Sequence, residues 1–246
     1  MIRLLGAVRV ERGGDESLLS GAQPKMVLVY LGLERDCPVS ADELGAALWP
    51  DEHAEYSAGA LRGVVSKARA FLHSSVGDGA DIENLGGCYR FVHDEAVQVD
   101  LVDASAQVHR AERLFADGSA ELAVAPALEA VELLRPNLLP GLDRDWLGQR
   151  RAELTRLRRR ALCLAARIDT ELGAVEDAVE LAEGAVLLDP FDEASQRTLI
   201  AAHLRAGDRS GALRAYEACR RLLSVELGVA PSPETESLHA LALQAD

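Results

Sequence analysis

The sequence contains little of several residue types on which other classes of protein depend. Lysine occurs only at Lys25 and Lys67, so arginine supplies nearly all of the positive charge. Aromatic residues make up only 4% of the 246 residues, which argues against a β-sandwich or a β-barrel. The four cysteines are far apart and form no Cys-x-x-Cys pair, which argues against a disulfide framework or a zinc site. These absences favour a helix-rich protein of a reducing compartment.

Long apolar runs are also missing. No stretch approaches the ~20 apolar residues that span a bilayer. The segment MIRLLGAVRVERGG has too short an apolar run for a signal peptide and lacks a small-residue cleavage site. We therefore expect a cytoplasmic protein with no membrane partner.

The motifs of common enzymes and cofactor sites do not occur. The sequence has no GxxxxGK, HExxH or GxSxG segment. The glycine pairs at 13–14 and 86–87 are not followed by a helix, as a nucleotide-binding loop would require. The histidines show no metal-ligand spacing; they are His53, His73, His93, His109, His203 and His239. We expect no catalytic residue, no metal ion and no cofactor, and therefore no enzyme.

Net charge limits how the protein can bind nucleic acid. The formal charge is -14, and the first hundred residues hold nine Lys/Arg against sixteen Asp/Glu. Neither half of the chain is a polycation, so non-specific affinity for nucleic acid should be weak. Any DNA binding must come from a local basic surface.

The first hundred residues combine short strands with helices. Residues 1–19 alternate loosely around a turn at Gly13-Gly14, which predicts short antiparallel strands. A helical pattern runs over residues 22–34, and Ser40 with Glu43 forms a capping box before a short helix that ends near Trp49.

A third helix and a hairpin follow. The segment SAGALRGVVSKARAFL, at residues 57–72, has apolar residues at helical spacing, and its predicted buried stripe consists of Leu61, Val65, Ala68 and Leu72. Residues 81–93 read as two strands about Gly86-Gly87. Strands, three helices and a hairpin in this order predict a winged helix-turn-helix domain, which we place at residues 1–97.

Residues 98–246 look entirely helical and contain a repeat. A set of positions recurs at an offset of 34 residues: Gly173, Ala178, Ala182, Ala185 and Pro190 match Gly207, Ala212, Tyr216, Cys219 and Ser224. The same internal spacing occurs at Gly118, Ala123, Ala127 and Ala130. A glycine between helices and small residues in the second helix are typical of tetratricopeptide repeats. An alanine-rich bundle with accidental spacing is the alternative. The predicted fold class is mainly α, with an α+β winged helix followed by an all-α tetratricopeptide-like domain.

Several segments together resemble the Streptomyces antibiotic regulatory protein family. They are VSADELGAALWPDE at 39–52, LRGVVSKARAFL at 61–72, GGCYRF at 86–91 and RAGDRSGALRAYEACRRLLSVELGVAPSPETESLHAL at 205–241. Members of that family join a response-regulator-type winged helix to a bacterial transcriptional activator domain. The resemblance implies a transcriptional activator that binds direct repeats in promoter DNA and contacts RNA polymerase.

The resemblance also assigns candidate DNA contacts. In this class the third helix enters the major groove of the DNA. Lys67 and Arg69 match basic positions on that helix, and Arg62 and Ser66 lie on or near the same side. The remaining candidates are a basic residue early in the first helix and the pair that closes the wing; they are Lys25, Tyr89 and Arg90.

This recognition helix carries few basic groups. Gly63 and Val64 replace larger residues, Ala70 stands where relatives often carry another basic residue, and Leu85 replaces a basic residue of the wing. Because three or four positive groups per subunit support only modest affinity for phosphates, we expect a homodimer, at least on DNA.

Two charged segments have both a functional and a structural interpretation. The loop WPDEHAEYSAG corresponds to the loop that related activators use to touch RNA polymerase; Asp51, Glu52 and Glu55 would face a basic patch, or the loop is simply a solvated connector. The densest basic cluster consists of Arg150, Arg151, Arg156, Arg158, Arg159 and Arg160. We interpret this cluster as a solvated helix face paired with nearby acidic groups rather than as a second DNA contact.

Two functions of different classes remain open. The first is a sequence-specific, DNA-binding transcriptional activator. The second is a protein-interaction or effector-binding module that uses its tetratricopeptide-like grooves and whose winged helix has lost most of its affinity for DNA.

Overall fold

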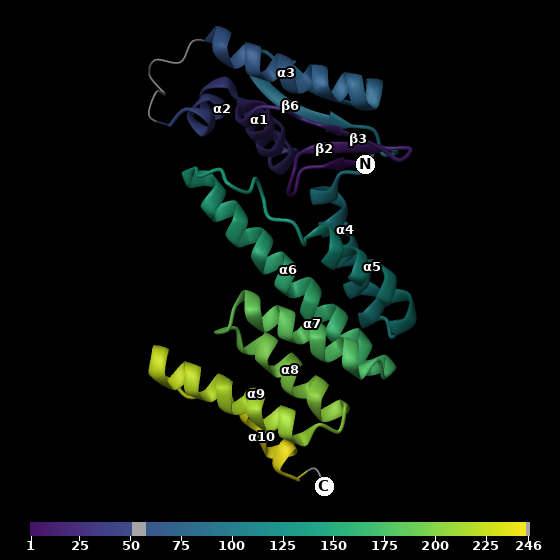
Figure 1. Cartoon of the computed structure of the whole chain (residues 1–246), viewed down its shortest axis with the longest axis vertical. Coiled ribbons are helices and arrows are strands. Elements are labelled where there is room, and N and C mark those ends of the chain that lie inside the picture. Colours follow the sequence, from purple (N-terminus) through teal and green to yellow (C-terminus); the bar gives the residue numbers. More distant parts are fainter. Residues whose placement is uncertain (51–57, 245–246) are drawn as a thin grey trace. The chain divides into compact units, whose positions relative to one another are not determined.

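The computed structural model describes residues 1–50 and 58–244, which form two compact units (Figure 1). The first unit comprises Met1–Asp103 and Leu133–Ala152. The second comprises Ala104–Glu132 and Glu153–Asp246. The predicted domain boundary at residues 97 and 98 stays a proposal.

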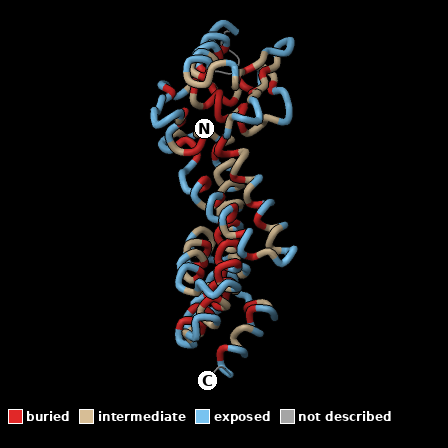
Figure 2. The backbone as a smooth tube through the Cα atoms, turned by 90° about the vertical axis from the view of Figure 1, so that its right-hand side faces the viewer, coloured by how far each residue is buried: buried red, intermediate tan, exposed pale blue. Residues whose placement is uncertain are grey.

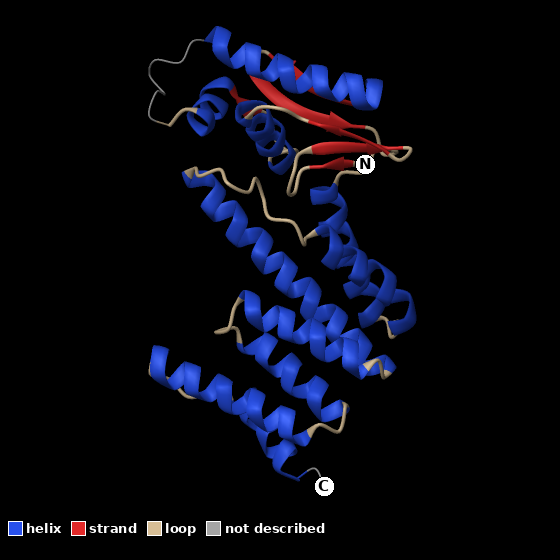
Figure 3. Ribbon diagram, viewed as in Figure 1, coloured by secondary structure: helices blue, strands red, loops and turns tan. Residues whose placement is uncertain are grey.

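The first unit holds two small antiparallel sheets. In one sheet the strand order is β1 (Ile2–Arg3), β2 (Arg9–Arg12) and β3 (Asp15–Leu18). In the other it is β4 (Val39–Ser40), β6 (Cys88–His93) and β5 (Ala80–Leu85). Figure 3 shows the strands in red. Both hairpins turn at a glycine pair with positive φ, which a two-residue turn between twisted strands requires. The predicted strands and turns are confirmed.

Three helices complete the winged helix. They are α1 (Ala22–Leu33), α2 (Ala41–Leu48) and α3 (Ala58–Val76), and a 3₁₀ turn, η1 (Gly77–Gly79), leads from α3 into β5. The Ser40 hydroxyl accepts a hydrogen bond from the Glu43 amide at 3.1 Å, so Ser40 caps α2 as predicted. The core of the unit uses large side chains, including Ile2, Met26, Leu28, Leu44, Leu61, Leu72 and Ile82.

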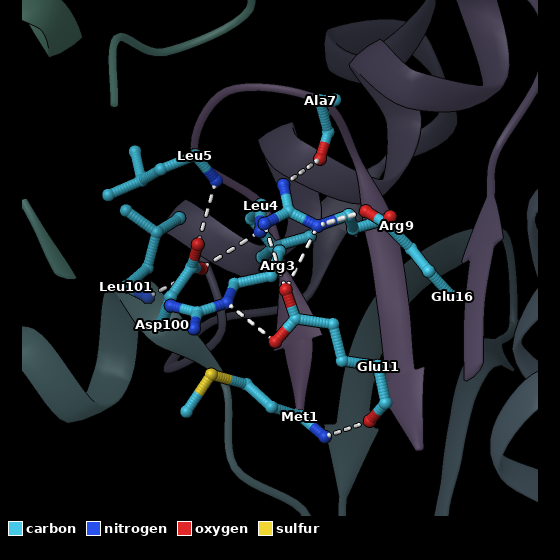
Figure 4. A network of polar contacts seen from close by, with 10 residues as sticks. All are labelled: Met1, Arg3, Leu4, Leu5, Ala7, Arg9, Glu11, Glu16, Asp100 and Leu101. Carbon is cyan, nitrogen blue, oxygen red and sulfur yellow. Dashed lines mark hydrogen bonds and ion pairs between the residues drawn. The ribbon is translucent and has the colours of Figure 1, made fainter. Parts of the chain in front are cut away.

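A buried carboxylate joins the residues that directly follow β1 to the start of α4 (Asp100–Ala116) (Figure 4). Asp100 is 1% exposed and accepts hydrogen bonds from the backbone amides of Leu4 at 2.8 Å, Leu5 at 2.9 Å and Leu101 at 2.8 Å. Burial raises the pKa of Asp100 to about 6, although these three hydrogen bonds act to lower it.

Residues 133–152 pack with the winged helix rather than with the helices around them in sequence. The Trp146 indole donates to the Ala47 carbonyl at 3.1 Å, and its ring meets Tyr30 edge-on at a centroid distance of 5.0 Å. Arg150 pairs with Glu34. Arg151 donates to the carbonyls of Leu138, Leu139 and Leu142 at 2.7–3.0 Å and so stabilises the loop before α6 (Asp145–Leu172).

The second unit is built from helix pairs. After α4 and α6, the remaining helices are α5 (Ala120–Leu133), α7 (Val175–Leu188), α8 (Glu193–Arg205), α9 (Arg209–Leu222) and α10 (Pro233–Gln244), with a π-turn, η2 (Leu223–Leu227), after α9. Gly118, Gly173 and Gly207 have φ of 71–83° and lie between the helices of three successive pairs. Only glycine adopts this conformation at little cost, so each repeat needs it at the same place.

The repeated positions, which are small residues except for Tyr216, form the seams between these helices. All nine are at most 3% exposed: Ala123, Ala127, Ala130, Ala178, Ala182, Ala185, Ala212, Tyr216 and Cys219. Figure 2 shows the backbone of this unit with buried residues in red. Small side chains allow paired helices to approach closely, which is the packing that the 34-residue repeat predicts. The predicted fold class, a winged helix followed by an all-α tetratricopeptide-like domain, is confirmed.

Candidate nucleic-acid interface

Helix α3 has one buried face and one exposed face. The predicted stripe of Leu61, Val65, Ala68 and Leu72 is confirmed, because each of these side chains is at most 3% exposed. Val64, at 9%, joins the buried face and is therefore not available at the surface. The opposite face presents exposed residues that include Arg62, Gly63, Ser66, Lys67 and Ala70.

The scaffold beneath α3 is formed by α1, α2 and β5, all of which contact it. The Tyr30 hydroxyl on α1 donates to the Glu43 carboxylate on α2 at 3.0 Å. Burial, together with this bond to Glu43, raises the pKa of Tyr30 to about 12, so the phenol keeps its proton and the link at neutral pH. These contacts hold the two preceding helices against the one that carries the candidate contacts.

Arg69 lies at the edge of the exposed face and is bound to β5. Its Nε is 3.0 Å from Asp81 Oδ1, and Nη2 donates to the Ile82 carbonyl. The same Asp81 oxygen lies 3.1 Å from His73 Nε2, one turn further along α3. The guanidinium of Arg69 is therefore bound to β5 through the carboxylate of Asp81 and the carbonyl of Ile82.

The wing, formed by β5 and β6, has a similar arrangement. Arg90 Nη2 lies 2.8 Å from Glu83 Oε2, directly across the ladder, and each of these side chains is 40% exposed. Tyr89 is only 5% exposed and pairs with Val39 and Asn84 in the sheet. Of the two predicted wing contacts, only Arg90 thus has a substantial surface.

The other predicted contacts divide into those that the structure describes and those that it does not. Lys25 is half-buried in the first turn of α1. Asp51, Glu52 and Glu55, the predicted polymerase-contact residues, lie outside the described residues. Among residues 1–50 and 58–244, Lys25, Arg62 and Lys67 form no ion pair, whereas Arg69 and Arg90 each have an acidic partner.

Sequence reasoning missed Asp81 and Glu83, the acidic partners of the candidate DNA contacts. The pairing of Glu83 with Arg90 could have been predicted from the sequence. A two-residue turn at Gly86-Gly87 places Glu83 opposite Arg90, as the strand register shows. The pairing of Arg69 with Asp81 had no such signal, because it depends on how α3 crosses β5.

Most arginines of the basic cluster on α6 form ion pairs or hydrogen bonds with residues of the unit to which each arginine belongs. Arg159 pairs with Asp192, and Arg160 makes a bidentate contact with Glu112. These ion pairs agree with the interpretation of a helix face that is paired with nearby acidic groups. Arg156 is exposed and forms no ion pair with another described residue.

The part of the chain that the structure describes contains no group of three or more His, Cys, Asp or Glu side chains that could hold a metal ion. None of its helices is long and apolar enough to cross a membrane. The four cysteines are all free thiols.

Comparison with known proteins gives a family and two similar regulators. The model of the bacterial transcriptional activator domain family matches residues 99–243. The regulatory protein AfsR of Streptomyces coelicolor is 29% identical over 243 residues, and AfsR of Streptomyces griseus is 28% identical over 244. Each alignment covers 99% of this chain but 24% of the relative, so the chain spans about a quarter of the length of these proteins.

A solved structure has the same fold. EmbR of Mycobacterium tuberculosis, in complex with a low-affinity phosphopeptide, superposes with a TM-score of 0.87. The alignment covers 98% of this chain and 64% of the EmbR chain, at 23% identity. At this level of identity the likeness establishes the shared fold of the winged helix and the helical repeats.

Proposed function

The chain belongs to the bacterial transcriptional activator domain family, whose members regulate transcription, and on this premise we propose that it is a sequence-specific DNA-binding activator. The observation that carries the proposal is the exposed face of α3. Arg62, Ser66 and Lys67 project from a helix whose other face is fixed in the core. This is the geometry that lets a recognition helix enter a major groove.

The candidate residues would have different roles. Arg62, Ser66 and Lys67 would contact bases and phosphates, while Lys25 would contact the backbone from α1. Arg69 on α3 and Arg90 on β6 flank β5. Each would contact a phosphate once its ion pair, with Asp81 or Glu83, is broken. Tyr89, being buried, would support the wing from beneath rather than contact the DNA.

Charge supports binding as a pair of subunits. Three cations without an acidic partner among the described residues give a salt dependence of slope about -3 in a plot of log affinity against log salt. A homodimer on a promoter with direct repeats would double that slope to about -6. We further propose that Asp51, Glu52 and Glu55 contact RNA polymerase and that the protein acts in the cytoplasm.

The test is a selection of DNA from random duplexes by the full chain, followed by footprinting of the enriched sequence. We expect the double variant Arg62→Ala/Lys67→Ala to lose the footprint while keeping its circular dichroism and oligomeric state. The matched control is Arg110→Ala/Arg113→Ala, which removes two exposed charges from α4 and should leave the footprint unchanged.

Two results would count against the proposal. One is a wild-type chain that enriches no sequence even at about 50 mM salt, where phosphate contacts are strongest. That result would favour the alternative of an interaction module without DNA affinity. The other is a footprint that survives the loss of Arg62 and Lys67.

A second arm addresses the acidic partner of Arg69. Asp81→Asn removes the carboxylate that holds Arg69 and His73. If Arg69 reaches phosphate, the variant should bind the selected DNA more tightly than wild type, and its salt slope should steepen by about 1 per subunit. Asp78→Asn, an equal change of charge at an exposed position, is the control.

A further inference from the structure

The second unit contains a trough along the first helices of its pairs. Three adjoining hollows, of about 920, 410 and 370 Å³, are lined mainly by faces of α4, α6 and α8, with Leu238 of α10, and all three share Arg167. The seams of small residues lie elsewhere, on the second helices of the pairs. Two of the side chains that line the trough also contribute to the core of the unit: Leu164 belongs to it, and Phe115 packs against it.

Positive charge gathers in this trough although the chain as a whole is acidic. Six arginines line it, namely Arg156, Arg159, Arg160, Arg167, Arg197 and Arg205. Four acidic residues do so: Glu112, Glu153, Glu171 and Asp192. The excess is two positive charges in a protein whose net charge is -14.

Not all of these arginines are neutralised. Arg159 and Arg160 are paired with Asp192 and Glu112. By contrast, Arg156, Arg167 and Arg205 are exposed and form no hydrogen bond or ion pair with any other described residue. Guanidinium groups that are exposed and have no hydrogen-bond or ion-pair partner are suited to bidentate binding of carboxylates.

Arg167 is also oriented in advance. Its guanidinium carbon lies 5.3 Å from the centroid of the Phe115 ring, in a cation–π contact. Phe115, Leu157 and Leu164 add an apolar lining beside it. A ligand that carries carboxylates on either side of apolar groups would match this combination.

We propose that this trough is a binding site for an acidic, extended peptide segment of a partner protein. Arg156 and Arg167 are the two principal anchors. Eleven positions on one helix place them about 16 Å apart along its axis. An extended peptide advances about 3.3 Å per residue, so its acidic positions should be about five residues apart.

A peptide fits the lining better than DNA does. Glu112, Glu171 and Asp192 lie in the same trough and would repel the continuous phosphates of a duplex. A peptide can place isolated carboxylates on the arginines and apolar side chains between them. The proposal goes beyond DNA binding and involves none of the residues of α3 or the wing.

The test uses the full chain and two fluorescein-labelled, end-blocked peptides of equal composition. In Glu-Glu-Leu-Ala-Leu-Glu-Glu the acidic pairs are separated as the anchors require; in Leu-Ala-Leu-Glu-Glu-Glu-Glu they are contiguous. We expect fluorescence anisotropy to show tighter binding of the first peptide. Arg156→Ala/Arg167→Ala should weaken it by at least about tenfold, since two charge-assisted contacts are lost.

The control variant and the DNA assay separate the possible outcomes. Arg110→Ala/Arg113→Ala removes the same charge from α4 outside the trough and should bind the first peptide like wild type. The proposal is overturned if wild type binds neither peptide at about 50 mM salt, or if both double variants bind equally. It is also overturned if the trough variant weakens duplex binding while the peptides do not bind. Loss of the α3 footprint with intact peptide binding would instead reject only the proposed DNA function.

Discussion

The two units of this protein build their cores from different side chains. Most of the large, fully buried side chains belong to the first unit, among them Leu28, Leu48 and Leu72, whereas the second unit buries fewer, such as Ile168 and Ile200. In the second unit the buried seams are lined mostly by alanine, as at Ala127, Ala182 and Ala212. Large side chains fill the core of the first unit, whereas in the second unit small side chains allow the helix backbones to approach closely.

The difference in core packing matches the surface that each unit exposes. In the first unit, large interlocking side chains fix the rotation of α3 about its axis, and this rotation decides which residues face outward. In the second, small residues on the second helix of each pair pack against residues of the first helices, such as Ile168 and Ile200. The first helices also line the trough. Three predictions test this contrast.

The largest effect is expected from a cavity in the first core. Leu72→Ala removes a fully buried side chain from the α3 stripe and should lower the free energy of unfolding by about 2–5 kcal/mol. Both tryptophans, Trp49 and Trp146, lie in the first unit, so fluorescence during urea unfolding reports this loss. Leu187→Ala, at a side chain that is 82% exposed in the second unit, should change this transition by less than about 0.5 kcal/mol. Equal shifts for the two variants would contradict a tightly filled first core.

A pH-dependent effect of nearly the same size is expected at Asp100. Its pKa of about 6 lies above the usual 3.8, so the protonated carboxyl favours the folded state. That stabilisation is complete below about pH 4 and is lost as the pH rises through 6, whereas the amide of Asp100→Asn does not titrate. Between these limits, the stability of wild type relative to the variant should fall by about 3 kcal/mol. Tryptophan-monitored urea unfolding at both ends of the range measures the difference, and a constant difference would contradict it.

The smallest effect is expected from overfilling the second core. Ala182→Leu inserts a larger side chain where the seam is fully buried and should cost about 1–3 kcal/mol. Because most of the helices lie in the second unit, the loss should appear in circular dichroism and much less in tryptophan fluorescence. Ala125→Leu, at an exposed position of α5, is the control. If the two leucine variants melt alike, the seam is not closely packed.

Much of the fold was predictable because its signals are local. The period of apolar residues on α3, the capping serine before α2 and the glycine pairs of the two hairpins each lie within a few consecutive residues. The 34-residue repeat is longer in range but equally regular, and its glycines and small residues occupy the predicted places. The candidate contacts Arg62, Ser66 and Lys67 are exposed as expected because they lie off the α3 stripe.

What could not be predicted depends on how separate elements meet. Arg69 and Arg90 were expected on the DNA-facing surface, yet Asp81 and Glu83 of β5 hold them. Trp146, far along the chain, packs on Tyr30 in the winged helix. The three-helix trough with its arginines was not foreseen either.

Spacing along the chain therefore specified the elements, their order and their buried faces, because hydrophobic periodicity and turn chemistry act between near neighbours. The assembled fold selected the partners of the charged side chains. A guanidinium reaches whichever carboxylate or carbonyl the packing places within a few ångströms, and no local pattern carries that information.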